Sequence, residues 1–213
     1  MKLPKIMYYF MLLMFVSCTG NDPAQSSNEP LEKANVASNE LTIVVQPFDD
    51  LPEGYLGPVI KELRKVYPRV VVQPPIKLPP TALNQSGTRY RADSLIRFLR
   101  DYRYFIKSGH VTLGLTSKDV SVTRSQISDC CIMGLAFRPG NACIASSFRL
   151  KAGNKTRNLF KLALHELGHT QGLHHCSRWT CLMRTTRKNH FDELKGFCPK
   201  CKKTLLKAGW TLK

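Results

Sequence analysis

The sequence is short of acidic residues, and it lacks long apolar runs and internal repeats. Only 15 Asp and Glu residues oppose 32 Lys and Arg residues, which gives a formal net charge of +17. The N-terminal apolar run, residues 6–16, is too short for a membrane-spanning helix, which needs about 20 residues. Without repeats, the 213 residues are expected to form one average-to-large domain with its own core.

Residues 1–17 have the features of a lipoprotein-type signal peptide. Lys2 and Lys5 precede the apolar run, and Ser17 followed by Cys18 resembles a bacterial lipoprotein cleavage site. Cys18 would then be the lipidated first residue. An ordinary secretory signal with an incidental Cys18 is the alternative. In either case we expect an exported protein, and in the first a membrane-anchored bacterial lipoprotein on the periplasmic or cell-surface side.

Residues 18–40 are rich in Asn, Ser, Asp, Glu, Pro and Ala, so they bury too little apolar surface to fold. We interpret them as a flexible tether to the membrane. Residues 19–40 contain no cysteine, so no pro-segment with a zinc-blocking thiol is expected. Residues 41–213 then form the folded domain.

Apolar patterning predicts a mixed α/β (α+β) domain with a twisted mixed sheet. Strands are expected at 41–48, 70–72, 111–116, 131–136 and 142–147, and helices at 55–67, at 89–105 and from 157 onward. The last two strands would form a hairpin around the turn at 138–141.

The most informative segment is the eleven-residue run from His165 to His175. Apolar residues at helical spacing precede it, so His165 and His169 are expected one turn apart on one helix face, where both can bind one zinc ion. Glu166 lies beside the first ligand and can serve as general base.

Gly172 is expected to end this helix and turn the chain back, so that His175 becomes the third ligand. His174 is the rival third ligand, although the H-x-x-G-x-x-H spacing favours His175. Three protein ligands leave one position open, as in catalytic zinc sites. The alternative is a helix with surface histidines and an ion-paired glutamate.

A second zinc site is predicted from four cysteines. Cys198 and Cys201 form a C-x-x-C half-site, and Cys176 and Cys181 supply the other half. Four thiolates would close the zinc coordination shell and make this site structural. Two disulfides are the alternative. Because Cys176 follows His175, the closed site should also hold the third catalytic ligand in place.

These motifs together resemble the archaemetzincins, zinc metallopeptidases of the metzincin clan with a second four-cysteine zinc site. The resemblance covers about residues 41–205, with a shorter loop between Met183 and Cys198 than the family usually has. It implies two Zn²⁺ ions per chain, a Met-turn at Met183 beneath the catalytic zinc, and a zinc-stabilised C-terminal subdomain at about 176–213. It also implies a hydrolase acting on peptide or protein substrates, with an edge strand in 131–147 along the cleft. Two ordinary core strands are the alternative there.

Two other hypotheses for the function stay open. The chain could be a non-catalytic binding module stabilised by zinc, or a vestigial peptidase on a basic exported surface protein. A purely structural site needs no base, so Glu166 argues against the first. Nucleic acid is a poor partner for an exported protein, and we expect a monomer.

The remaining cysteines and the basic tail carry weaker predictions. Cys130, Cys131 and Cys143 are expected to be buried small hydrophobes, with one disulfide as the alternative. The tail from Arg184 is basic and could favour anionic lipid or acidic substrates, or could simply be solvated. Its expected apolar anchors are Leu194, Phe197, Leu205, Leu206 and Trp210.

Overall fold

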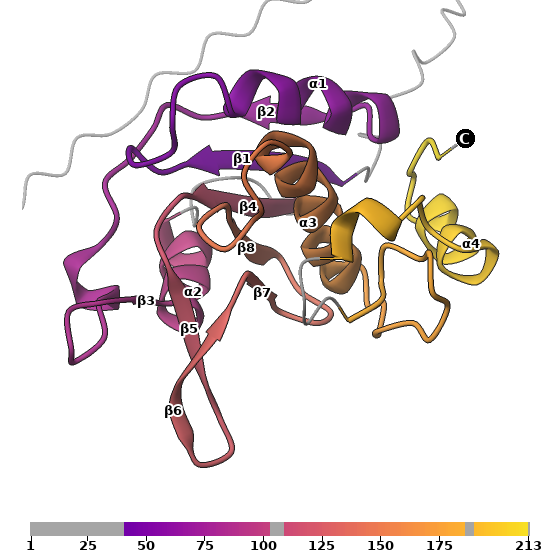
Figure 1. Ribbon diagram of the computed structural model, residues 1–213. Coiled ribbons are helices and arrows are strands. Elements are labelled where there is room, and N and C mark those ends of the chain that lie inside the picture. The colour runs from indigo at the N-terminus through magenta and orange to yellow at the C-terminus, as the bar shows by residue number, and fades with distance from the viewer. Residues whose placement is uncertain (1–40, 103–108, 186–189, 213) are drawn as a thin grey trace, which may run out of the picture. The chain divides into compact units, whose positions relative to one another are not determined.

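The computed structural model describes residues 41–102, 109–185 and 190–212 (Figure 1). The predicted signal peptide, the tether and Cys18 lie outside these residues. The described residues belong to one compact unit. None of their helices combines the length and apolarity that crossing a membrane requires.

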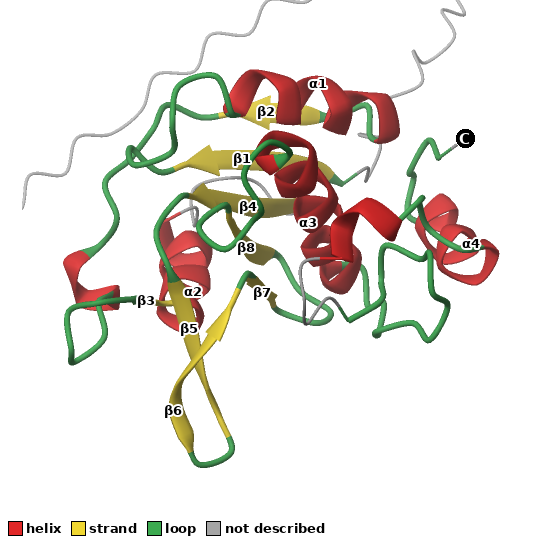
Figure 2. Cartoon of the chain, viewed as in Figure 1, coloured by secondary structure: helices red, strands yellow, loops and turns green. Residues whose placement is uncertain are grey.

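Helices and strands alternate in the first part of the fold, five consecutive strands follow, and two short 3-10 helices, Pro80–Ala82 and His190–Glu193, lie in the connections (Figure 2). In chain order, the described strands and α-helices are β1 (Thr42–Pro47), α1 (Leu56–Val66), β2 (Val70–Val72), β3 (Tyr90–Arg91), α2 (Ala92–Tyr102), β4 (His110–Thr116), β5 (Val120–Arg124), β6 (Ile127–Ile132), β7 (Gly134–Ala136), β8 (Ala142–Ser146), α3 (Lys155–Thr170) and α4 (Pro199–Lys207).

The main sheet has five strands in the order β2-β1-β4-β8-β7. The first four are parallel to one another, and β7 runs antiparallel to β8 at the edge. The central strand β4 is buried at every position from Val111 to Thr116, as expected for a parallel strand covered on both faces. The predicted mixed sheet is therefore confirmed.

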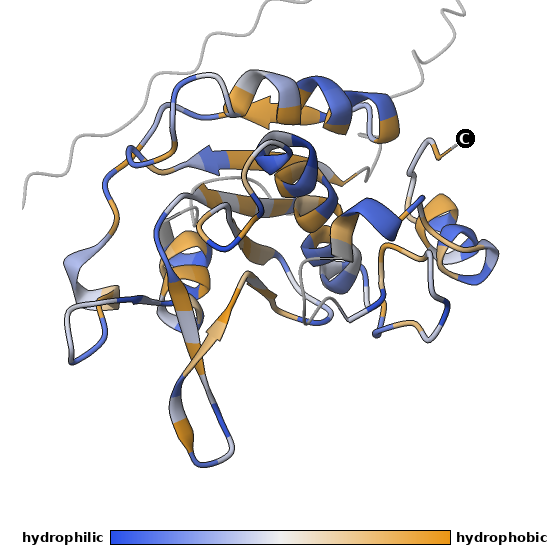
Figure 3. Cartoon of the chain, in the orientation of Figure 1, coloured by the Kyte–Doolittle hydropathy of each residue, from blue (hydrophilic) through white to orange (hydrophobic). Residues whose placement is uncertain are grey.

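Helices cover both faces of this sheet. Val59, Ile60 and Leu63 of α1 pack with α3 in one apolar cluster on one face. Leu95 and Leu99 of α2 belong to a second cluster on the opposite face. Figure 3 shows the apolar strands between the mixed apolar and polar surfaces of the helices. This arrangement leaves the antiparallel edge strand β7 next to α3.

A second sheet, in the order β3-β5-β6, was not predicted from the sequence. Strands β5 and β6 form a hairpin closed by Ser125 and Gln126, in which Ser125 has a φ of 51°. A positive φ is uncommon outside glycine and suits a tight hairpin turn. Figure 1 shows this hairpin projecting beyond the main sheet.

Two predicted elements have wrong boundaries. The expected strand 131–136 is split at Met133, with Cys131 in β6 of the small sheet and Gly134–Ala136 in β7 of the main sheet. The expected helix 89–105 begins only at Ala92, because Arg91 lies in β3 and hydrogen-bonds Thr123 and the Ser128 carbonyl on the hairpin. Its predicted end lies outside the described residues.

The cysteines outside the zinc motif are only partly as expected. Cys143 on β8 is buried, whereas Cys130 is half-buried and Cys131 is exposed, so the prediction of three buried thiols is wrong for two of them. All seven described cysteines are free. Cys131 and Cys143 lie in different sheets, and no disulfide joins them.

The C-terminal segment packs back onto α1. The Trp210 ring meets the Tyr67 ring edge-on at 5.4 Å, and the Thr211 amide donates to the Val66 carbonyl at 2.9 Å. Leu205 is fully buried as expected, but Leu206 on the other side of α4 is 47% exposed and is no anchor.

Candidate active site

Helix α3 carries the first two histidines in the interior. Its residues from Lys161 to Thr170 are all buried, since α1 and β8 pack against one side and the C-terminal segment against another. His165 and His169 are 6% and 8% exposed. Apolar residues at helical spacing account for this burial, as the sequence predicts.

The chain reverses directly after α3. Gly172 has a φ of 86°, which favours glycine, and the Leu173 amide donates to the Gly168 carbonyl at 3.1 Å. This reversal returns His175 to the two helical rings. His174 is exposed and lies outside the cluster of metal-binding groups.

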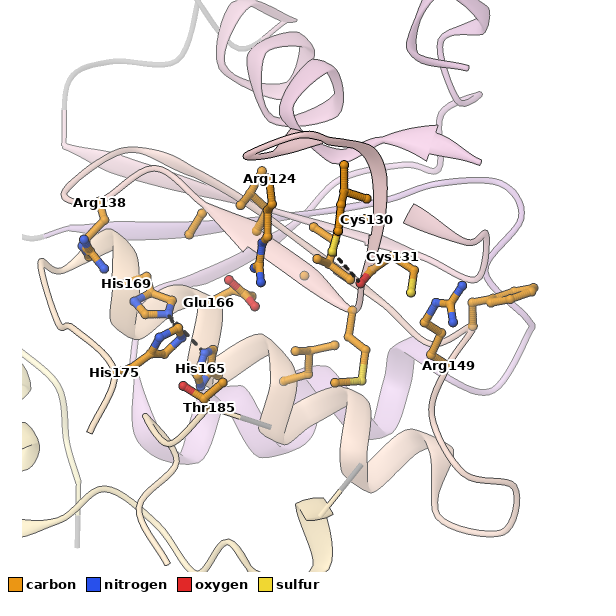
Figure 4. Close-up of a pocket in the computed structure, with 18 of the residues that line it drawn as sticks. Arg124, Cys130, Cys131, Arg138, Arg149, His165, Glu166, His169, His175 and Thr185 are labelled. Carbon is orange, nitrogen blue, oxygen red and sulfur yellow. Dashed lines mark hydrogen bonds between the residues drawn. The ribbon is translucent and has the colours of Figure 1, made fainter. Parts of the chain in front are cut away.

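The three imidazoles converge through one nitrogen each. Nε2 of His169 lies 3.1 Å from Nε2 of His165 and 3.3 Å from Nε2 of His175 (Figure 4). Zinc–nitrogen bonds of about 2.0–2.1 Å in a tetrahedron place two ligand nitrogens about 3.3 Å apart. The observed separations therefore fit one zinc ion held by all three rings.

Backbone carbonyls orient two of these rings. Nδ1 of His165 lies 2.6 Å from the Leu182 oxygen, and Nδ1 of His169 lies 2.7 Å from the Leu173 oxygen. Each Nδ1 therefore carries the proton and donates it, which leaves the Nε2 lone pairs facing one another. Burial lowers the pKa of His165 to about 3, although the hydrogen bond to Leu182 opposes this shift. Neutral rings with convergent lone pairs are suited to a cation.

Glu166 is buried beside this cluster, with 5% of its surface exposed. Burial raises the pKa of its carboxyl group to about 8, and the positive charge of Arg124 offsets part of the shift. The carboxylate lies against the backbone of β7, where a Cβ at Gly134 would be 2.5 Å from Oε1. Figure 4 shows the carboxylate directed into the cleft, toward Arg124.

Met183 packs against the helix between the two histidines. A Cβ at Gly168 would lie 2.5 Å from the Met183 sulfur, and Met183 itself is fully buried. The methionine therefore packs against α3 at Gly168, and its fit depends on the missing side chain there.

The four cysteines form the second cluster. One sulfur from each of Cys176, Cys181, Cys198 and Cys201 lies within 4.8 Å of the others, and those of Cys176 and Cys198 are 3.8 Å apart. Zinc–sulfur bonds of about 2.3 Å in a tetrahedron give sulfur separations of about 3.8 Å. The set therefore fits a closed zinc site and contains none of the alternative disulfides.

Cys198 is favourably placed to be a thiolate. Burial raises the pKa of its thiol, but hydrogen bonds from the Cys201 backbone and from the neighbouring thiols outweigh this and bring the pKa to about 7. It is also the N-cap of α4, where the helix dipole favours negative charge.

A cleft of about 1600 Å³ runs over the histidine cluster. Small-molecule sites usually measure roughly 300–1,000 Å³, so this cleft can take a longer ligand such as a peptide. One of its walls is formed by Gly134, Leu135 and Ala136 of the edge strand β7, and another by the β5–β6 hairpin. The edge strand expected along the cleft is therefore confirmed as part of its wall.

Comparison with known proteins agrees with this geometry. A sequence profile described as "Peptidase family M54" matches residues 43–207. The chain belongs to this family. The match spans the sheet, α3 and both metal clusters, so the archaemetzincin resemblance drawn from the motifs is confirmed, as are the metallopeptidase class and the two zinc cofactors.

Archaemetzincins are among the proteins with similar sequences. The one from Haloquadratum walsbyi is 29% identical over 181 residues, covering 78% of this chain and 99% of the relative. The one from Halobacterium salinarum is 28% identical with the same coverage.

Solved structures of archaemetzincins have the same fold. The Archaeoglobus fulgidus protein, crystallised with malonate, is 26% identical with a TM-score of 0.65, covering 76% of this chain and 99% of that chain. The Methanopyrus kandleri protein, at 24% identity and a TM-score of 0.67 over 82% of this chain and 98% of its own, supports the fold alone.

Sequence reasoning missed several residues of this M54 site. Leu182 contributes only its backbone carbonyl to the site, and Arg138 lies in a turn. No sequence pattern around either residue indicated a role in the site. Gly134 did have one, since glycine inside a strand often marks a close approach to another group. Arg124 lies on a hairpin that was not predicted.

Proposed function

We propose that this zinc metallopeptidase binds its catalytic zinc through His165, His169 and His175 and uses Glu166 as general base. The observation that carries the proposal is the convergence of three Nε2 atoms beside a buried carboxylate in one cleft. When bound, zinc supplies a Lewis acid for the scissile carbonyl and makes water more acidic.

Glu166 has the environment that a proton carrier needs. It takes a proton from the attacking water and delivers it to the leaving amine. Burial raises the pKa of this carboxyl group, so its carboxylate is a stronger base than an exposed one and can carry the proton between these two steps. Gly134 leaves the space in which the carboxylate lies.

Strand β7 offers the substrate a backbone partner. As the edge of the five-stranded sheet it can pair with an extended peptide, which would lie along the cleft as an added strand. Leu135 and Ala136 then contact the peptide next to the bond that is cut. Cys176, Cys181, Cys198 and Cys201 hold the structural zinc of the C-terminal subdomain.

The test is a quenched peptide library with purified protein, with and without a chelator. Metal analysis should give two zinc ions per chain, and chelation should abolish cleavage. Glu166→Ala should keep both zinc ions while turnover falls by about 10²- to 10⁴-fold. Turnover that survives Glu166→Ala would refute the assignment of the base.

We also propose that the protein is exported and anchored through a lipid on Cys18, and that it acts as a monomer. The charged start, the short apolar run and Ser17-Cys18 support the anchor. Labelled fatty acid should enter the wild-type protein but not Cys18→Ser, which should be released in soluble form. Wild-type protein without label would contradict the anchor, and a dimer in sedimentation velocity would contradict the monomer.

A further inference from the structure

The cleft has an uneven charge. Three arginines line it, Arg124, Arg138 and Arg149, and Glu166 is the only acidic residue in the described part of its wall. Because Glu166 is only 5% exposed, its carboxylate presents little surface to a ligand in the open cleft.

Among the described residues, only one of the three guanidinium groups is paired with a carboxylate. Arg149 donates from Nε and from a terminal nitrogen to the Asp119 carboxylate, at 2.8 and 2.6 Å. Arg124 and Arg138 have no ion pair or hydrogen bond within residues 41–102, 109–185 and 190–212, and both are exposed. The guanidinium groups of Arg124 and Arg138 are therefore available to bind a ligand in the cleft.

These two arginines come from different elements but line the same cleft as the histidines and Glu166. Arg124 ends β5 at the hairpin turn, and Arg138 follows β7. Figure 4 shows Arg124 directed toward Glu166 and Arg138 beside His169.

We propose that Arg124 and Arg138 bind carboxylate groups of the peptide substrate near the scissile bond, so that the enzyme prefers acidic peptides. This inference rests on the proposed peptidase function. A guanidinium presents paired N–H donors that match a carboxylate, and such charge-assisted bonds are stronger than neutral ones. The carboxylate can come from an acidic side chain or from the C-terminus of a peptide, and these two sources can be distinguished.

The first experiment compares matched quenched peptides. One peptide carries Glu on both sides of the scissile bond, a second carries Gln at the same positions, and both have an amidated C-terminus. A third has Gln and a free C-terminal carboxylate close to the scissile bond. Wild-type kcat/KM for the Glu peptide, or for the third peptide, should exceed that for the amidated Gln peptide by about tenfold or more.

The arginine variants assign the preference. The quantity compared is the ratio of kcat/KM for a carboxylate peptide to kcat/KM for the amidated Gln peptide. Arg124→Gln and Arg138→Gln should each reduce this ratio several-fold, and the double variant should bring it close to one. Arg124→Lys should keep part of the preference. Arg97→Gln is the matched control, because it removes the same charge from an α2 side chain that is 60% exposed and lies outside the cleft wall. Its ratio should equal that of the wild type. Salt should weaken the preference, since both arginines are exposed.

A binding measurement keeps the test independent of turnover. Fluorescence anisotropy with zinc-loaded Glu166→Gln protein should give tighter binding of the carboxylate peptide than of the neutral one, and the double arginine variant should lose the difference. If no peptide is cleaved but this difference appears, the proposed catalysis fails and the specificity stands. Equal affinities and equal kcat/KM ratios in wild type and the arginine variants would overturn the inference.

Discussion

The carbonyl oxygen of Leu182 lies 2.6 Å from Nδ1 of His165, while the amide of Leu182 donates to the Gly196 carbonyl at 2.8 Å. A second link lies beside the third ligand, where the Cys176 amide donates to the Met183 carbonyl at 2.8 Å. The segment that holds the four cysteines therefore also orients the His165 ring and holds the backbone next to His175.

Disturbing the cysteine site should weaken the catalytic one. In Cys198→Ser, partial loss of the structural zinc should loosen Leu182 and lower the affinity of the histidines for zinc by about 10- to 100-fold, as for other partners of metal-binding histidines. Competition with a chromophoric chelator measures this affinity. Lys203→Ser on the exposed side of α4 is the control, and a Cys198→Ser protein with full catalytic zinc and full activity would rule out the coupling.

Gly134→Ala should inactivate the enzyme without removing its metal. The new Cβ would lie 2.5 Å from Glu166 Oε1 and 2.7 Å from the Ile144 carbonyl oxygen, so either the carboxylate or the edge strand must move. We expect kcat to fall by about 100-fold and the zinc content to stay at two. Gly196→Ala, where no atom lies within 4 Å of the new Cβ, should behave as wild type. Unchanged kcat in Gly134→Ala would show that Glu166 has room to shift.

Gly168 and Met183 should be energetically coupled. Alanine at Gly168 gains about 1 kcal/mol of helix propensity, but its Cβ would be 2.5 Å from the Met183 sulfur and 3.2 Å from its methyl carbon. Overpacking of this kind costs about 1–3 kcal/mol, so Gly168→Ala should not stabilise the protein.

A double-mutant cycle tests this coupling. In the Met183→Ala background the added methyl group has space, so Gly168→Ala should become neutral or stabilising in urea unfolding. Gly57→Ala on α1, with nothing within 4 Å of its new Cβ, is the control and should not lose stability. Additive free energies for Gly168→Ala and Met183→Ala would show that the contact carries no energy.

Glu166 should make stability depend on pH when its zinc has been removed. Because burial raises its pKa from 4.5 to about 8, the folded chain keeps a proton that the unfolded chain releases between these values. The contribution of Glu166 to the free energy of unfolding is therefore greatest below pH 4.5. It decreases as the pH rises to 8, by up to about 1.4 kcal/mol per pH unit.

The comparison is between wild type and Glu166→Gln, with dipicolinate present to remove the exchangeable zinc. Urea unfolding at pH 5, 6.5 and 8 should show the variant gaining stability relative to wild type as the pH rises. A difference that stays constant across these pH values would mean that the carboxylate is not held in its neutral form.

The ligands of both metal sites could be found in the sequence because their spacing is local. His165 and His169 are one helical turn apart, and Cys198 and Cys201 are separated by two residues, so the backbone alone brings each pair together. The glycine that turns the chain toward His175 also leaves a local signal. The core strands β1 and β4 were predicted because buried parallel strands form continuous apolar runs.

The walls of the cleft could not be predicted in the same way. Strands β5 and β6 carry polar residues on a projecting hairpin, and β3 has only two residues, so none shows an apolar period. The division of 131–136 between two sheets depends on two different partner strands, since Cys131 pairs with Ser121 and Leu135 pairs with Ile144. Arg124 and Arg138 meet at one cleft only through these pairings.

The packing of Trp210 on Tyr67 joins segments from opposite ends of the described fold. Helix α1 is made early in synthesis, yet its contacts with residues 210 and 211 cannot form until those residues have left the ribosome. Contacts between such distant segments form late, which delays compaction of the nascent chain. If the chain is exported as proposed above, and in an unfolded state, it would gain time from this delay.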